Sequence, residues 1–281
     1  MKNKIVPILT AILCLAGFGI MIYPAVSDFI NRINSSRAIQ EFATQMEDIE
    51  DTELMAQLEY ARQYNDVIAK GKLPENGETV KDYYEILDFT NHMMGYVEID
   101  KINVKLPIYH GVSSDVLAKG VGHLPNSTFP IGGEGYHAVL TAHTGLPSAK
   151  LFTDLVELKI GDCFKVFVAD RELTYKVDNI ETVIPSEVDD ITPVPGEDYC
   201  TLVTCTPYGI NSHRLLVRGA RVYEEENIDT NTSTDNTIKF IGYPSIDLIV
   251  LILCLISTIK RLILEKKSKK EKACPEIDSL E

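Results

Sequence analysis

Short runs of alternating apolar and polar residues recur from Met94 to Tyr223, and this pattern most constrains the fold of the chain. Turn residues separate the runs, for example at Gly132-Gly133 and at Val194 to Gly196. Alternation puts every second side chain on one face of a strand, and short strands at regular spacing are typical of all-β folds. We therefore expect this region to form a β-barrel or β-sandwich.

One pair of runs carries a candidate nucleophile. The stretch TLVTCTPYGINSHRLLVRG begins at Thr201, ends one strand at Cys205, turns at Pro-Tyr-Gly, and opens a second apolar run at Arg214. Two strands joined by a tight loop bring a thiol and a guanidinium close together. A neighbouring positive charge favours the thiolate and stabilises an oxyanion. The stretch therefore predicts half of a cysteine nucleophile site.

A histidine upstream supplies the third member of the site. The run 136–143, YHAVLTAH, alternates in the same way, ends in His143 and breaks at Gly145. An imidazole at the rim of a sheet would act as general acid and base beside Cys205. A lone His or Cys in an apolar strand is more often core packing. The position of all three residues at strand ends favours a triad of Cys205, His143 and Arg214.

With these motifs the chain resembles the sortases, transpeptidases of Gram-positive bacterial surfaces. The similar segments are GYVEIDKINVKLPIYHG, GVGHLPNSTFPIGG, LTAHTGLPSAKLFTDL, and TLVTCTPYG with its Arg nine residues after the Cys. PYGINSHR, AHTGLPSAKLFTDL and the two hydrophobic ends resemble the pilus-assembling subgroup, class C. The resemblance implies a mainly β fold: a sortase-type eight-stranded β-barrel with short helices, preceded by an N-terminal helical segment and flanked by two transmembrane helices.

The resemblance also implies roles for the triad. Cys205 would attack the Thr-Gly carbonyl of an LPxTG-like sorting motif and form a thioacyl enzyme. His143 would protonate the leaving amine and later deprotonate the incoming one, and Arg214 would hydrogen-bond the oxyanion. In pilin sortases the incoming amine is a lysine side chain, so the expected partners are pilin subunits with a sorting signal and an acceptor lysine. No cofactor is implied.

Two other functions remain open. A sortase that attaches surface proteins to peptidoglycan would use the same triad with a different amine. A non-catalytic membrane assembly partner would keep the fold alone, and the intact set of Cys205, His143 and Arg214 argues against that alternative.

Class C sortases usually carry a lid before the barrel, in which an Asp-Pro-aromatic motif covers the catalytic Cys. This chain has no Asp-Pro pair, but Asp82, Tyr83 and Tyr84 lie in about the corresponding place. A carboxylate near Arg214 and a ring over Cys205 would exclude substrate, so these three residues are the predicted lid. The alternative, that the tyrosines simply pack on the barrel, stays open.

The long segment before the cysteine strand, Val183 to Tyr199, is expected to recognise the substrate, because loops on a rigid barrel commonly carry specificity. The predicted substrate-binding residues are Val188, Ile191, Val194 and Thr204. The first three would line a groove for the Leu-Pro part of a sorting motif, but they would equally suit the core side of a short helix.

Both ends of the chain contain apolar stretches. Ile5 to Val26 is about 22 residues without a charge, long enough to span a bilayer, and two lysines precede it. Phe240 to Ile259 is mostly apolar and is followed by a basic cluster, which belongs on the cytoplasmic side. We expect a cell-membrane protein with both termini cytoplasmic and the catalytic domain extracellular. A cleavable signal peptide is the alternative for the first stretch.

The expected segments follow from these features. They are a transmembrane anchor (1–27), a helical segment with the lid (28–93), the catalytic barrel (94–223), a polar linker (224–238), a transmembrane helix (239–264) and a basic tail (265–281). Helical periodicity begins at Ser36 and has a break near Asp51. Its apolar stripe contains Ile39, Phe42, Met46 and Ile49, continued by Met55, Leu58 and Tyr64.

Composition excludes some functions. The formal net charge of −14 argues against nucleic acid as a partner, because phosphate binding needs a basic patch. The chain has no closely spaced Cys and His pairs, so we expect no metal site. The acidic group of Glu187, Asp189 and Asp190 is read as a solvated loop, with a calcium site as the lesser alternative. A disulfide between Cys200 and Cys205 would consume the nucleophile.

Overall fold

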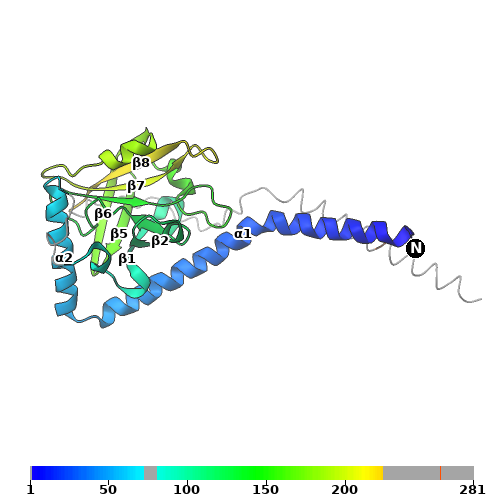
Figure 1. Ribbon diagram of the computed structural model, residues 1–281, viewed down its shortest axis with the longest axis horizontal. Coiled ribbons are helices and arrows are strands. Elements are labelled where there is room, and N and C mark those ends of the chain that lie inside the picture. Colours follow the sequence, from blue (N-terminus) through cyan, green and yellow to red (C-terminus); the bar gives the residue numbers. More distant parts are fainter. Residues whose placement is uncertain (1, 73–80, 224–259, 261–281) are drawn as a thin grey trace, which may run out of the picture. The chain divides into compact units, whose positions relative to one another are not determined.

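The computed structural model describes residues 2–72, 81–223 and 260. Within them, eight strands form a closed barrel in the hydrogen-bonded order β1-β2-β3-β4-β7-β8-β6-β5 (Figure 1). The strands are β1 (Met93–Ile99), β2 (Val104–His110), β3 (Val121–His123), β4 (Tyr136–Thr141), β5 (Cys163–Val168), β6 (Arg171–Val183), β7 (Asp198–Thr206) and β8 (His213–Arg221). The predicted mainly β fold with an eight-stranded barrel is confirmed.

Most neighbouring strands of the barrel are antiparallel, but β2 with β3 and β4 with β7 are parallel. The pairing of β1 with β5 closes the barrel. Two glycines of the barrel, one on β1 and one on β8, have close neighbours that leave no room for a side chain. A Cβ at Gly95 would lie 2.0 Å from the carbonyl oxygen of Phe167, and one at Gly219 would lie 2.7 Å from the ring of Phe164. A larger residue at either position would push the barrel wall apart.

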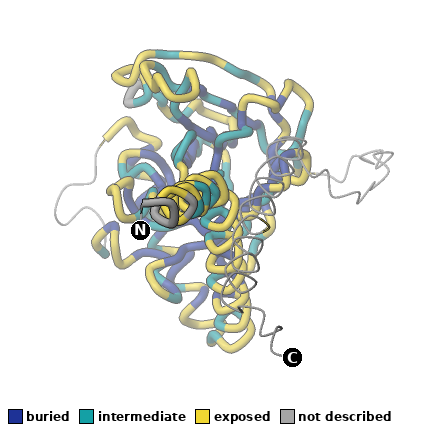
Figure 2. The backbone as a smooth tube through the Cα atoms, turned by 90° about the vertical axis from the view of Figure 1, so that its right-hand side faces the viewer, coloured by how far each residue is buried: buried dark blue, intermediate teal, exposed yellow. Residues whose placement is uncertain are grey.

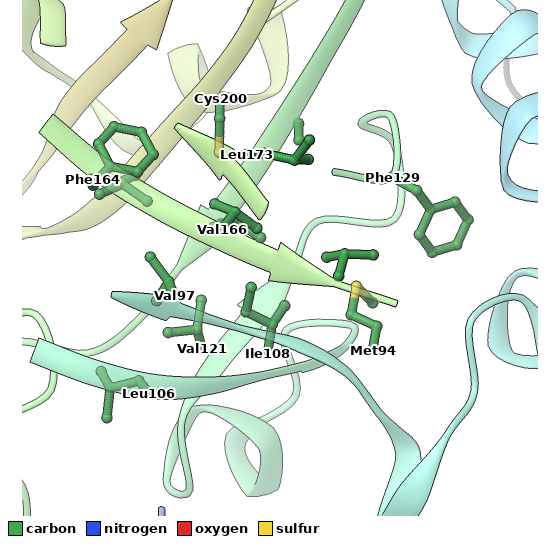
Figure 3. Close-up of a cluster of buried hydrophobic side chains, with 14 of the residues drawn as sticks. Met94, Val97, Leu106, Ile108, Val121, Phe129, Phe164, Val166, Leu173 and Cys200 are labelled. Atoms are coloured by element: carbon green, nitrogen blue, oxygen red, sulfur yellow. The ribbon is translucent and has the colours of Figure 1, made fainter. Parts of the chain in front are cut away.

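The inward face of each strand fills the barrel with apolar side chains. Figure 2 marks the buried residues in dark blue along the backbone. Figure 3 shows part of this core, in which Val97, Ile108, Val166 and Cys200 come from four different strands and are all fully buried. Such burial supplies the main favourable free energy of folding. The core also fixes which face of each strand remains outside, and the candidate site lies on that outer face.

Two helices precede the barrel, α1 (Lys2–Asp48) and α2 (Asp51–Ala69). The gap between them confirms the predicted break near Asp51. Ile39 and Phe42 of α1 are buried as expected, and the ring centroids of Phe42 and Phe89 lie 5.9 Å apart. Met55 was expected on the buried stripe, but it is 71% exposed. That prediction is wrong because the buried stripe of α2 consists of Leu54, Gln57, Leu58, Ala61, Tyr64, Asn65 and Ile68.

The second helix is fixed to the barrel by side-chain to backbone hydrogen bonds. Asn65 is fully buried; its amide donates to the carbonyl of Phe129 at 3.0 Å and accepts from the Phe129 amide at 2.6 Å. Gln57 accepts from the backbone amide of Leu87 at 2.8 Å. Each bond satisfies a backbone group that burial would otherwise leave unpaired.

Short helical segments complete the fold: α3 (Ser114–Leu117), η1 (Tyr83–Glu85), η2 (Thr90–His92), η3 (Asp100–Ile102), η4 (Thr153–Glu157) and η5 (Pro185–Asp190).

The N-terminal part of α1 is long and apolar enough to cross a membrane. An 18-residue window has a mean hydropathy of 2.1, and none of it is buried inside the protein. Residues 1–24 belong to a unit separate from the barrel unit, residues 25–227. The predicted second span, the polar linker and the basic tail lie outside the described residues, apart from Lys260.

Candidate active site

Three strand ends meet at one edge of the barrel. In the parallel pair of β4 and β7, Thr141 lies opposite Val203, so continuing this register by two residues places His143 alongside Cys205. In the antiparallel pair of β7 and β8, Cys205 lies directly opposite Arg214. Directly opposite residues have Cβ atoms about 5 Å apart on the same face. The three predicted residues, His143, Cys205 and Arg214, are therefore brought close together.

Alternation puts all three side chains on the outer face of the barrel. The neighbours Ala142 and Leu215, which flank His143 and Arg214, are buried in the core. The intervening residues His143, Cys205 and Arg214 each remain partly exposed. The nucleophile is thus accessible from outside the barrel, and its wall is rigid.

The backbone around His143 is held on both sides. The Ala142 amide donates to the carbonyl of Val203 at 3.1 Å, and the hydroxyl of Thr204 donates to the Ala142 carbonyl at 2.8 Å. Thr204 is only 3% exposed, so its side chain is used inside the wall. The predicted substrate contact of Thr204 is therefore replaced by a positioning role: it ties the cysteine strand to the residue before His143.

The guanidinium of Arg214 is oriented by the loop between β7 and β8. Its Nη1 donates to the carbonyls of Asn211 and His213, at 3.2 and 3.1 Å. No ion pair with Arg214 is present among the described side chains. A guanidinium has five N–H donors, so donors remain for an oxyanion beside Cys205.

An aromatic side chain joins the two loops that flank the site. Tyr208, in the loop after Cys205, packs over Gly145, where a Cβ would lie only 3.2 Å from the ring. Gly145 also has φ +73°, a conformation that L side chains rarely adopt. Both the nearby ring and the backbone conformation therefore favour glycine at this position. Sequence analysis did not single out Tyr208. The signal was present in the Pro-Tyr-Gly turn directly after the cysteine strand.

The segment between β6 and β7 also reaches the site. Val183, the last residue of β6, pairs with Arg214, so the short helix η5 begins next to the candidate oxyanion donor. Val188 and Ile191 are partly exposed, and Val194 is 40% exposed. None of the three belongs to the buried core, which removes the alternative that they form the core side of a helix. Their contact with substrate stays a prediction.

A buried histidine fixes this segment to the barrel. His137 of β4 is hydrogen-bonded through Nδ1 to the Thr192 carbonyl at 3.1 Å and through Nε2 to the Thr201 hydroxyl at 2.7 Å. Because the carbonyl can only accept, Nδ1 carries the proton. Burial lowers the pKa of His137 to about 4, so the ring is neutral at pH 7. His137 carries no role in the sequence pattern, because its contact with this segment depends on the tertiary fold.

Tyr83, one of the predicted lid residues, has different surroundings from those expected. The hydroxyl of Tyr83 accepts from the Gly111 amide and contacts His123 Nδ1, both at 3.0 Å, and its ring is 8% exposed. His123 pairs with Leu140, three residues before His143, or roughly 10 Å along the strand. Tyr83 is therefore a core residue rather than a ring over Cys205.

Tyr84 keeps the features of a surface residue. It is 61% exposed and packs against Tyr83, with ring centroids 4.9 Å apart. The adjoining residues 73–80 lie outside the described part of the chain. A lid role for Asp82 and Tyr84 stays a prediction.

The cysteines of the barrel are unpaired. Cys163, Cys200 and Cys205 are all free. Cys200 and Cys205 are five residues apart on one strand, roughly 16 Å, and point to opposite faces, so a disulfide between them is sterically excluded. Among the described residues, no group of three or more His, Cys, Asp or Glu is placed to hold a metal ion. The side chains of Asp189 and Asp190 are not among those described.

Comparison with known proteins agrees with this geometry. The family model for the sortase domain matches residues 97–222. Sortase D of Bacillus subtilis is 32% identical over 136 residues, which cover 47% of this chain and 66% of that protein. Sortase A of Streptococcus agalactiae is 33% identical over 119 residues, covering 41% and 47% respectively. The chain thus spans about half to two thirds of the length of these curated relatives.

Solved structures match over a longer region. Sortase C1 of Streptococcus agalactiae is 43% identical with a TM-score of 0.63, covering 67% of this chain and all of that one. Sortase C of Clostridium perfringens, solved with the C-terminal cell wall sorting motif, is 42% identical with a TM-score of 0.61, covering 67% and 99%. Sortase C of Streptococcus pneumoniae, described for its catalysis and pilin substrate specificity, is 41% identical with a TM-score of 0.59, covering 67% and 97%.

These matches define the class of protein. The chain belongs to the sortase family, whose members are cysteine transpeptidases, and its structural neighbours are class C sortases.

Proposed function

We propose that this chain is a pilin-polymerising transpeptidase with Cys205 as nucleophile. The observation that carries the proposal is the meeting of Cys205, His143 and Arg214 on one outer face, at three neighbouring strand ends. The solved sortase C structures, one with a sorting motif and one described for pilin specificity, support this choice of substrate class.

The reaction proceeds in two acyl transfers. The Cys205 thiolate attacks the Thr carbonyl carbon of an LPxTG-like motif, and Arg214 hydrogen-bonds the oxyanion that forms. The Thr–Gly bond then breaks, the leaving amine takes a proton from His143, and a thioester remains on Cys205. A lysine amine of another pilin subunit attacks this thioester and gives its proton to His143. The C–S bond breaks, so the thiolate returns and an isopeptide bond remains.

Each loop around the site has a part in this proposal. Val188, Ile191 and Val194 receive the Leu-Pro part of the motif, because they are partly exposed in the segment that follows Val183, the residue paired with Arg214. The apolar part of α1 anchors the enzyme in the cell membrane, with the barrel outside the cell and both termini in the cytoplasm.

Mass spectrometry of products tests the function. The full-length chain in detergent micelles would be incubated with a peptide containing Leu-Pro-Glu-Thr-Gly and a lysine-containing pilin domain, with the Cys205→Ala variant as control. We expect an isopeptide-linked product that is absent from the control. A second reaction offers a glycine peptide as amine, in place of the pilin domain.

The two reactions separate the candidate functions. Transfer to the glycine amine but not to lysine would overturn pilus assembly and favour attachment to peptidoglycan. Absence of both transfer and hydrolysis, for the wild type as for the control, would favour a non-catalytic partner.

A further inference from the structure

The loop that follows His143 is held by a residue of α1. The backbone amide of Lys150 donates a 2.8 Å hydrogen bond to Oδ1 of Asp28, which lies 122 positions earlier in the chain. Asp28 comes two residues after Val26, where the predicted membrane span ends. The Lys150 side chain takes no part in this bond, because its ammonium group pairs with Asp154.

A single residue, Leu151, separates Lys150 from Phe152, whose amide bonds to His143. Leu151 is 3% exposed and has φ +42°, a left-handed backbone that costs free energy for a non-glycine residue and persists only when its surroundings enforce it. Phe152 is fully buried, and its amide donates to the His143 carbonyl at 3.2 Å. A shift of Lys150 is therefore passed to His143, because neither Leu151 nor Phe152 has room to absorb it.

The buried face of α1 changes character along the helix. Farther from the predicted span, Ile39 and Phe42 bury apolar side chains. Nearer to it, the face is polar: Ser35 is 4% exposed and its hydroxyl has no partner among the described residues. Apolar burial is non-directional, whereas a hydrogen bond fixes a position. Near the predicted span, the bond from Asp28 therefore sets where the loop lies.

We propose that Asp28 is a positioning residue for catalysis. It couples α1, the helix that carries the predicted membrane span, to loop 144–152, and thereby sets the position of the His143 imidazole relative to the Cys205 thiol. The inference rests on the proposed function, in which His143 is the general acid and base. A fragment that begins after Asp28 keeps the triad and lacks this coupling.

Four variants of the full-length chain test the coupling. Asp28→Ala removes the acceptor, and Asp28→Asn keeps an acceptor oxygen at the same place. Arg32→Ala removes the ion pair between Arg32 Nε and Asp28 Oδ2, 3.0 Å apart, and leaves the bond to Lys150. Lys150→Ala removes the pair with Asp154 and keeps the backbone amide.

Three measurements are made on each variant in detergent micelles. They are hydrogen exchange of segment 144–152, kcat and KM for transfer, and the pH dependence of Cys205 alkylation by iodoacetamide. For Asp28→Ala we expect faster exchange, a shifted alkylation profile, and kcat lower by about fivefold with KM little changed, as the loss of one hydrogen bond predicts. Asp28→Asn, Arg32→Ala and Lys150→Ala should stay near the wild type.

Each other outcome decides against the coupling. Unchanged exchange and kcat in Asp28→Ala would overturn it, and so would an equal loss in Asp28→Asn, which would point to charge rather than to the hydrogen bond. If the wild type transfers nothing, the proposed function fails, while exchange and alkylation still decide whether Asp28 positions the loop.

Discussion

The outer wall formed by β4, β7 and β8 carries a histidine and an arginine at each end, and the two ends are used differently. At the start of β7, both ring nitrogens of His137 are hydrogen-bonded, and Arg218 makes two bonds to one carboxylate, at 3.0 and 2.8 Å. At the end of β7, Arg214 lies opposite Cys205, and the register of β4 with β7, continued by two residues, puts His143 alongside. Among the described contacts there, no hydrogen bond joins any two of these three side chains.

The difference shows how one wall serves stability and reactivity. A side chain whose donors and acceptors are all satisfied contributes to stability but has none left for a substrate. A partly exposed group with donors to spare, such as the Arg214 guanidinium, keeps them for a charge that develops during reaction. We call the part of the wall around His137 and Arg218 the closed end, and the part around His143 and Arg214 the open end. The two ends have the same residue types and differ in how many of their side-chain donors and acceptors are hydrogen-bonded.

The largest expected difference between the two ends is in catalysis. Arg214→Ala should lower kcat for transfer by about 100-fold or more, because an oxyanion donor is lost, with little change in stability. Arg218→Ala should leave kcat within about twofold and cost at most about 1 kcal/mol, since its pair with Asp178 is partly exposed. Steady-state transfer kinetics and urea unfolding of both variants measure this. If Arg214→Ala and Arg218→Ala lowered kcat equally, the proposed difference between the two ends would be wrong.

A second difference should appear in stability, at the start of β7. Asp198 is 5% exposed and accepts from the Gly133 amide at 2.9 Å and from the hydroxyls of Tyr223 and Tyr175, at 3.1 and 3.3 Å. Asp198→Ala leaves these donors unpaired and should lower the free energy of unfolding by about 3 kcal/mol, with kcat kept at temperatures where the variant is folded. The exposed Asp178→Ala serves as control in the same urea titration. A loss of kcat without a loss of stability would contradict this assignment.

The open end could be predicted in part from sequence, because part of it is local. Cys205 and Arg214 belong to one antiparallel pair with a short loop, and alternation plus the turn residues predicts their approach. His143 follows β4, a strand that lies about 60 positions before β7 and pairs with it in parallel. No local pattern encodes such a pairing. Alternation and the strand-end position made His143 a candidate, and the resemblance to known sortases added support for its place beside Cys205.

The roles that sequence could not predict depend on single tertiary contacts. The Thr204 hydroxyl bonds the backbone of another strand, and the Tyr83 hydroxyl bonds Gly111 and His123. The sequence pattern shows no sign of either contact, because the partners are far apart in the chain and follow no strand or helix periodicity. The prediction for Met55 failed for a related reason, because the tertiary docking of α2 decides which of its faces is buried.

The smallest expected difference between the ends is a dependence of stability on pH that comes from His137. Burial lowers its pKa in the native state to about 4, from 6.5 for an exposed imidazole, and Arg218 nearby acts in the same direction. Above pH 6.5 the ring is neutral in both the native and the unfolded state. Between pH 6.5 and 4 the unfolded chain binds a proton that the native protein does not, so the free energy of unfolding falls as the pH falls.

The free energy of unfolding should change by at most about 1.4 kcal/mol per pH unit. Between pH 6.5 and pH 5.5 it should therefore fall by about 1 kcal/mol. His123, whose pKa burial lowers to about 3, adds a loss of the same sign, so the wild type alone cannot isolate His137. The measurement is urea unfolding of the wild type and of His137→Gln from pH 7.5 to 4.5, compared as a difference. The difference in the free energy of unfolding between the wild type and His137→Gln should become smaller as the pH falls. Parallel curves would mean that native His137 takes up the proton as readily as the unfolded chain does, and that this end of the wall is as open as the end that carries Cys205.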